Sequence, residues 1–173
     1  MNEARASAGG GRASATAERW IVAAVDFDVD TVWGMTVARG RFGRVGGSYQ
    51  AGPNGARLKL TVDATSVETG SEMWDDLLRS NDSLDLVAHP QVRFTSTGIR
   101  DSGDGTLDVT GRLEAAGKVV PVEFRAAVRR LDRELEITAT ATVDRHQLGK
   151  NGGRLGLMLP AKVHVRARFG AGG

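Results

Sequence analysis

The sequence predicts an all-β protein, an eight-stranded antiparallel barrel with one short helix between strands 3 and 4. Apolar and polar residues alternate with a period of two in about eight segments, which is typical of strands with one solvated face. Turn-forming residues separate these segments at hairpin spacing. Helical spacing occurs in one window, and eight antiparallel strands suffice to close a barrel.

The first half of the chain supplies three of these strands. Residues 20–29 alternate cleanly, whereas residues 35–49 contain several glycines, which mark bulges or sharp bends within strands. A turn at residues 52–55 leads into residues 57–64, where apolar and polar positions alternate again.

A short amphipathic helix is expected next. Its apolar flank consists of Met73, Trp74, Leu77 and Leu78, at positions i, i+1, i+4 and i+5. Beyond Pro90 the period returns to two. A single helix among strands indicates a lid over one opening of the barrel, and this arrangement favours a container over a catalyst.

The second half of the chain supplies the remaining strands. They are expected at residues 92–99, 107–113, 120–128, 135–143 and 159–169. Reversals lie at residues 101–105, 116–118 and 131–133, and residues 149–156 form a glycine-rich loop.

The inward-facing positions of the predicted barrel include many small residues, and only 5% of the chain is aromatic. These small residues are Ala64, Gly98, Gly111, Ala126, Ala139 and Ala141. Small inward side chains leave space in a barrel, and an apolar space takes up apolar ligands. The alternative is that they relieve crowding in a filled barrel. The residues predicted to line a binding cavity are Phe27, Phe42, Leu60, Val62, Trp74, Leu78, Phe94, Leu107, Val109, Phe124 and Ile137.

Length and composition indicate one domain. Residues 1–19 are rich in Ala, Gly and Ser and predict a disordered tail, so the barrel is expected over residues 20–173. The chain contains no cysteine, which excludes disulfides and thiolate chemistry. No window has the apolar run of a signal peptide or a transmembrane helix, so a cytoplasmic location is expected.

The charged residues do not predict an enzyme, a cofactor or a nucleic-acid partner. The net charge of +2 is small, and no basic run is interleaved with aromatic residues. Asp26, Asp28 and Asp30 form an acidic stripe that fits either a hard-cation site or the solvated face of a strand. His89 and His146 lie in separate segments without the spacing of a metal pair, although His146 lies where it would meet a polar head group at the rim. No nucleophile has a base beside it.

Basic residues form a stripe along one face of the last predicted strand. It consists of Lys162, His164, Arg166 and Arg168. One interpretation is weak contact with anionic membrane surfaces. The other is a charged sheet edge that prevents aggregation. An exposed edge would also allow a homodimer.

Several segments, taken together and in order, resemble the YceI-like, polyisoprenoid-binding family. They are residues 37–42, 66–70, 76–80, 89–97, 109–113, 117–121 and 144–149. The resemblance implies a lipocalin-like barrel with an elongated apolar tunnel that holds a long-chain isoprenoid or a similar amphiphile. Two features depart from the family pattern: a short first strand, and Ser83-Leu84-Asp85-Leu86 in place of a doubled phenylalanine after the helix.

The expected function is therefore non-catalytic transport or sequestration of a polyprenol, an isoprenoid quinone or a similar amphiphilic lipid. The alternative is an interaction module with a filled barrel, which recruits a partner through its basic last strand or its tail. A hydrolase or an isomerase is a remote third reading, because the catalytic groups are missing.

Overall fold

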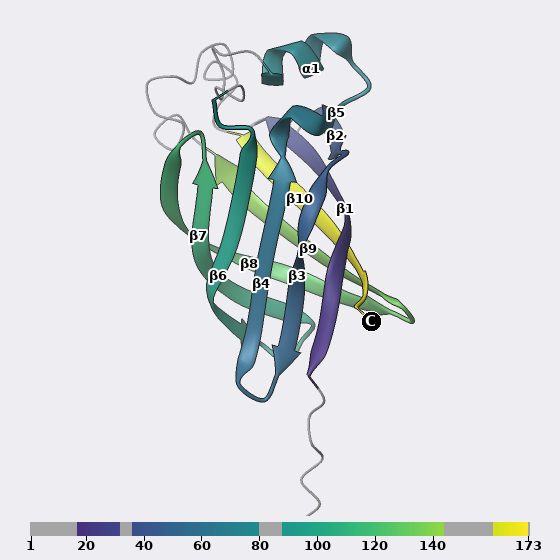
Figure 1. Cartoon of the computed structure of the whole chain (residues 1–173), viewed down its shortest axis with the longest axis vertical. Coiled ribbons are helices and arrows are strands. Elements are labelled where there is room, and N and C mark those ends of the chain that lie inside the picture. The colour runs from purple at the N-terminus through teal and green to yellow at the C-terminus, as the bar shows by residue number, and fades with distance from the viewer. Residues whose placement is uncertain (1–16, 32–35, 80–87, 144–160, 173) are drawn as a thin grey trace, which may run out of the picture.

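The structure is a computed structural model that describes residues 17–31, 36–79, 88–143 and 161–172 (Figure 1). Its elements are β1 (Glu18–Thr31), β2 (Thr36–Phe42), β3 (Val45–Gly52), β4 (Gly55–Asp63), the 3₁₀ turn η1 (Ala64–Ser66), β5 (Val67–Glu68), α1 (Glu72–Arg79), β6 (Gln91–Asp101), β7 (Thr106–Ala115), β8 (Lys118–Leu131), β9 (Glu134–Val143) and β10 (Ala161–Ala171). Residues 18 and 19, which were expected in the tail, belong to the first strand.

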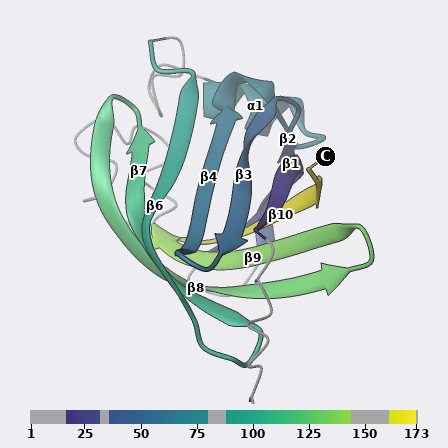
Figure 2. The ribbon, with the colours of Figure 1, turned by 60° about the horizontal axis from the view of Figure 1, so that its bottom comes forward.

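The predicted eight-stranded antiparallel barrel is confirmed. Its walls follow the order β1-β3-β4-β6-β7-β8-β9-β10, and β10 pairs with β1 to close the ring (Figure 2). The end where β1 begins is called the lower end here. The opposite end, over which α1 lies in Figure 1, is called the upper end.

Two walls are long strands interrupted by a bend. Residues 35–49 were expected as one strand, but the described part forms β2 and β3, which both pair antiparallel with β1. In the same way, β5 continues the β4 wall and pairs with β2 at Phe42 and Arg41. The predicted position of the helix, between the third and fourth walls, is correct.

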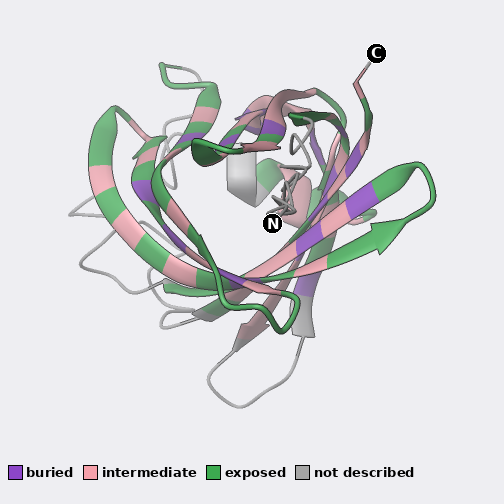
Figure 3. Cartoon of the chain, turned by 90° about the horizontal axis from the view of Figure 1, so that it is seen from below, coloured by how far each residue is buried: buried purple, intermediate pink, exposed green. Residues whose placement is uncertain are grey.

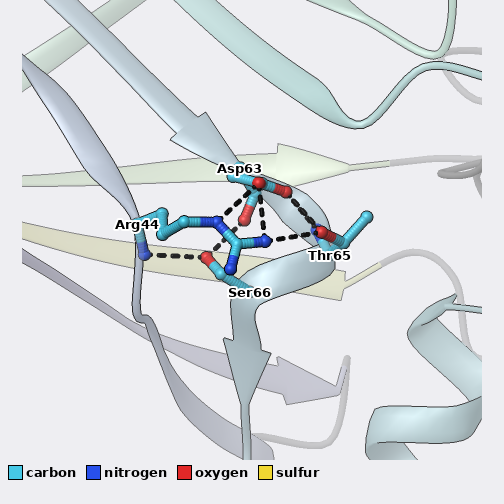
Figure 4. Close-up of polar contacts among 4 residues, drawn as sticks. All are labelled: Arg44, Asp63, Thr65 and Ser66. Atoms are coloured by element: carbon cyan, nitrogen blue, oxygen red, sulfur yellow. Dashed lines mark hydrogen bonds and ion pairs between the residues drawn. The ribbon is translucent and has the colours of Figure 1, made fainter.

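The bend is held by a polar network (Figure 4). Arg44 donates from Nε to Asp63 Oδ2 at 2.8 Å and from its backbone N–H to the Ser66 hydroxyl at 2.9 Å. Asp63 caps η1 by accepting from the Thr65 backbone N–H at 3.0 Å. The hydrogen bonds from Thr65 lower the pKa of Asp63, and Arg44 adds to the effect although burial opposes it. The network fixes the direction in which the chain leaves β4 for α1.

Alternating burial along the strands matches the predicted period (Figure 3). Buried side chains from each of the eight walls join in one apolar cluster. Gly98 is an exception to the predicted inward set, because a register shift between β6 and β7 leaves it exposed.

Two inward glycines make room for phenylalanine rings. A Cβ at Gly111 would lie 2.5 Å from the Phe94 ring and 2.6 Å from the Thr95 carbonyl oxygen, and a Cβ at Gly40 would lie 2.6 Å from the Phe27 ring. These rings therefore lie directly against the glycines of neighbouring strands. The space at Gly111 is already filled by Phe94, so this glycine does not leave the void that the sequence suggested.

Replacing Gly111 with alanine is expected to destabilise the fold by about 1–3 kcal/mol, because the Thr95 backbone cannot move away as a side chain would. Urea denaturation followed by circular dichroism measures the change. Gly46→Ala is the matched control, since a Cβ there meets nothing within 4 Å, and its effect should stay within about 0.5 kcal/mol. Equal stability of both variants would contradict the close packing of Phe94 on Gly111.

Candidate functional site

The predicted lining residues lie at different levels of burial. Those that are buried are Phe27, Val62, Phe94, Leu107, Val109 and Ile137, and those that are half-buried are Phe42, Leu60, Trp74 and Phe124. The side chain of Leu78 lies outside the described residues. The set therefore divides into side chains that are at most 9% exposed and side chains that keep more contact with solvent.

The lower half of the barrel is filled. Val25, Val109, Ala126, Leu135 and Phe169, from five different strands, are 0–1% exposed. A side chain without accessible area has no space for even a water molecule beside it, so these five residues form a packed core. The predicted lining residues Leu107, Val109 and Ile137 belong to this part of the barrel.

The lower end also carries a polar rim over apolar packing. Tyr49 is buried, and burial raises the pKa of its hydroxyl. Nearby, Arg130 Nη1 donates to Glu18 Oε2 at 2.6 Å, linking β8 to the start of β1. Apolar residues at this end, such as Trp20 and Val128, are half-buried.

The upper half has an accessible apolar inner surface. It consists of Leu113, Val122, Phe124, Ala139 and Val165, which alternate with outward residues on β7, β8, β9 and β10 and are only half-buried. The sequence predicted Phe124 as a lining residue and Ala139 as a small inward residue, but it did not predict the other three as lining residues. The alternation indicated that the others face inward, but their level along the barrel depends on strand register, which the sequence does not carry.

Aromatic pairs flank this surface. The Phe94 and Phe124 rings lie with centroids 5.4 Å apart, and they bridge β6 and β8 across β7 at Gly111. The Phe27 and Phe42 rings lie 5.1 Å apart and join β1 to β2. Such pairs fix ring positions by packing and by favourable tilted geometry.

The helix α1 lies over the upper end, as the view through the ring in Figure 3 also shows. Asp75 anchors it by accepting from the Thr69 backbone N–H at 2.8 Å and from the Thr69 hydroxyl at 2.6 Å. Trp74 is half-buried, whereas Met73 is 70% exposed. The predicted apolar flank is therefore only partly covered, since Met73 faces solvent.

The acidic and basic stripes neutralise each other on the outside of the barrel. Asp26 lies between Arg41 at 2.8 Å and Arg168 at 3.1 Å, and Asp28 accepts from Arg39 at 2.6 Å. The Nε2 atom of His164 lies 2.9 Å from Asp30, with Thr140 on its other ring nitrogen.

These ion pairs between β1 and its neighbours β2 and β10 change the interpretation of both stripes. The last strand is no sheet edge, because β10 pairs with β1 on one side and β9 on the other. The proposed edge-blocking role for its charges is therefore wrong. Within the described ranges, no cluster of His, Asp and Glu has the arrangement of a metal site.

Two guanidinium groups hold the pKa of Asp26 below its ordinary value. Burial alone would raise this pKa, but the hydrogen bonds and charges of Arg41 and Arg168 outweigh burial. The Asp26 carboxylate is thereby the centre of a link between β2, β1 and β10.

A separate cavity of about 360 Å³ lies at the upper rim, where β6 begins and β7 turns into β8. His89, Arg93, Glu114 and Val119 contribute to its walls, and none of the predicted lining residues does.

His146 lies outside the described residues. Of the helices in the described ranges, none has the length and apolarity that a membrane crossing requires.

Comparison with known sequences gives matches along most of the chain. A family model described as "YceI-like domain" matches residues 20–171. The UPF0312 protein of Azotobacter vinelandii is 33% identical over 90 residues, which are 50% of this chain and 47% of that protein. Protein YceI of Shigella flexneri is 39% identical over 74 residues, which are 43% of this chain and 38% of that protein. The matched segments thus span less than half the length of these curated relatives.

Comparison with solved structures identifies the same fold. Burkholderia cenocepacia BcnA matches with a TM-score of 0.66 and 18% identity, over 86% of this chain and 96% of that one. A polyisoprenoid binding domain from Saccharophagus degradans matches with a TM-score of 0.63 and 14% identity, over 90% of this chain and 99% of that one. At such identities the likeness shows a shared fold alone.

Asp26→Asn is expected to cost about 1 kcal/mol of stability at pH 7, since the partners Arg41 and Arg168 are partly exposed. Because the folded-state pKa is lowered, the stabilisation is present above the unfolded-state pKa of about 3.9 and is lost as the pH falls through the folded value. Thermal unfolding from pH 7 to pH 2 should show the difference shrinking below about pH 4.

The control is Asp28→Asn, because the Arg39 side chain that pairs with Asp28 is 78% exposed and a smaller loss is expected. Identical stability of native protein and Asp26→Asn at pH 7 would show that the three-strand link contributes nothing.

Proposed function

The chain belongs to the YceI-like domain family, and on that basis we propose that it binds a long-chain isoprenoid or a similar amphiphilic lipid inside its barrel. The role is transport or sequestration without covalent chemistry. The name of the Saccharophagus degradans domain, which describes polyisoprenoid binding, supports the ligand class. The curated relatives are matched over less than half of their length, so this assignment concerns the barrel alone.

The observation that carries the proposal is the accessible apolar inner surface of the upper half. Leu113, Val122 and Phe124 face inward beside a packed core and still retain contact with solvent. Covering such a surface with hydrocarbon is favourable by roughly 0.8 kcal/mol per methylene. That gain offsets the immobilisation of a chain with several isoprene units.

The depth of this surface limits how much of a ligand is enclosed. On β8 the half-buried inward positions run from Val120 to Phe124, a distance of about 13 Å along the strand, and end at the fully buried Ala126. The far end of the apolar chain therefore rests on the packed core. The remainder of a longer ligand, with its polar head, extends toward the upper end.

Native mass spectrometry and lipid extraction of the purified protein are expected to reveal a bound apolar lipid. Titration with geraniol, farnesol and geranylgeraniol is expected to give affinities that rise with chain length and then level off, because the packed core stops further burial. Absence of co-purified lipid together with no uptake of any prenol or quinone would contradict the proposal.

The rival function, recruitment of a partner through the basic last strand, has less support. Arg168 and His164 of that strand already contact carboxylates of β1, and Arg166 lies 3.8 Å from Glu136 of β9. Few of its charges are therefore free to bind a partner.

Tryptophan fluorescence separates the two functions. The chain has a third tryptophan, Trp33, outside the described residues, so both variants are made in a Trp33→Phe background. Farnesol is expected to change the emission of that background, and this change should be lost on adding Trp74→Phe, because Trp74 lies on the helix over the upper end. Trp20→Phe, at the lower end, is the control and should keep the response. A response that depends on Trp20 and not on Trp74 would place the ligand at the wrong end of the barrel.

A further inference from the structure

Among the described residues, the wall of the barrel is incomplete between β8 and β9. The two strands pair from Leu131 with Glu134 up to Ala126 with Ala139, and the pairing then stops. Both strands continue beyond this point, β8 back to Lys118 and β9 on to Val143. Each keeps its other partner, since β8 stays paired with β7 and β9 with β10. In Figure 2, β8 curves away from β9 toward its hairpin with β7.

The side chains at this split are apolar and accessible. Ala141 faces inward, because it pairs with Val163 while its neighbour Thr140 contacts the outward His164. Ala141 is nevertheless exposed, and Phe124 on the opposite side is half-buried. Ala126, where the pairing ends, is 0% exposed. Just beyond the end of the pairing, the inward residues Phe124 and Ala141 are therefore more accessible than Ala126.

A second interruption of strand pairing, between β4 and β6, differs from the first because it is closed. The pairing of β4 with β6 stops at Lys59 and Thr95. Beyond it, the Leu58 backbone N–H donates to the Ser96 hydroxyl at 2.9 Å, and Leu58 is only 5% exposed. This gap is bridged by a side chain and lies beside packed residues, so no apolar molecule passes there.

We propose that the apolar ligand enters the barrel sideways, between the upper halves of β8 and β9, over Ala141 and Phe124. The inference rests on the proposed function and adds the route to it. The route leads directly onto the accessible inner surface formed by Val122, Ala139 and their neighbours. Among the described residues, the two borders are not paired with each other, and the backbone N–H and C=O groups of such strand edges suit an uncharged polar head such as a prenol hydroxyl.

The absence of cysteine from the chain allows a direct test. Three single variants, Ala141→Cys, Thr142→Cys and Met73→Cys, place one thiol each at the split, on the outer face of the same strand and on α1. All three positions are exposed. Each thiol is coupled to a bulky methanethiosulfonate reagent, and uptake of dansyl-labelled farnesol is followed by stopped-flow fluorescence.

The label at Ala141→Cys is expected to slow uptake at least about tenfold, while labels at the other two positions leave the rate within about twofold. Removal of the label with a reductant should restore the rate, which separates a blocked route from a damaged fold. Unchanged uptake with the label at residue 141, or slowing only at residue 73, would overturn the route and leave the proposed function intact. Failure of the unlabelled native protein to bind the probe would instead overturn the proposed function.

Discussion

Closure of the sheet by its first and last strands is the constraint on which the other features depend. β1 pairs with β10 from Trp20 with Ala171 to Thr31 with Ala161, so neither strand is left as an open edge. The contact between Asp26 and Arg168 joins residues 142 positions apart in the chain. Such pairing forms only after nearly the whole chain is available, and long-range pairing of this kind slows folding. Before closure, the inward apolar residues have nothing to face.

Within the closed ring, one alternating pattern produces two different interiors. In the lower half, large side chains such as Leu135 and Phe169 meet and exclude water. In the upper half, the inward positions of β9 carry alanines, and the neighbouring strand bends away. The difference arises from side-chain size combined with strand pairing. Under the proposed function, stability and binding therefore belong to separate levels of the same barrel, since the proposed ligand surface can change without disturbing the packed core.

The period of two predicted the strands well because each strand has one apolar and one polar face over its own length. It placed Val92 and Phe94 correctly on one side of β6, and it identified most of the apolar residues that the barrel buries. The helix was found for the same reason, since its spacing is local. These features depend on neighbours within a few residues.

Features that depend on cross-strand register were not predictable in the same way. The stripe of Asp26 and Asp28 reads as an isolated acidic face until β2 and β10 bring arginines beside it. Gly98 faces outward because the pairing of β6 with β7 shifts there. The space at Gly111 is filled by the ring of Phe94, which comes from the neighbouring strand β6. The exposure of Met73 depends on how α1 settles on the barrel, which its own spacing does not determine.

The separation of β8 from β9 also has a mechanical meaning. Among the described strands, the upper part of β8 pairs with β7 alone, and β7 in turn pairs with β6 up to Glu114, so β8 is the free border of this part of the wall above Ala126. Outward movement of the upper part of β8 separates no β8–β9 pair and leaves the β1–β10 pairing intact. In the proposed route, the split can thus widen for branched or bulky chains while the ring below keeps its shape.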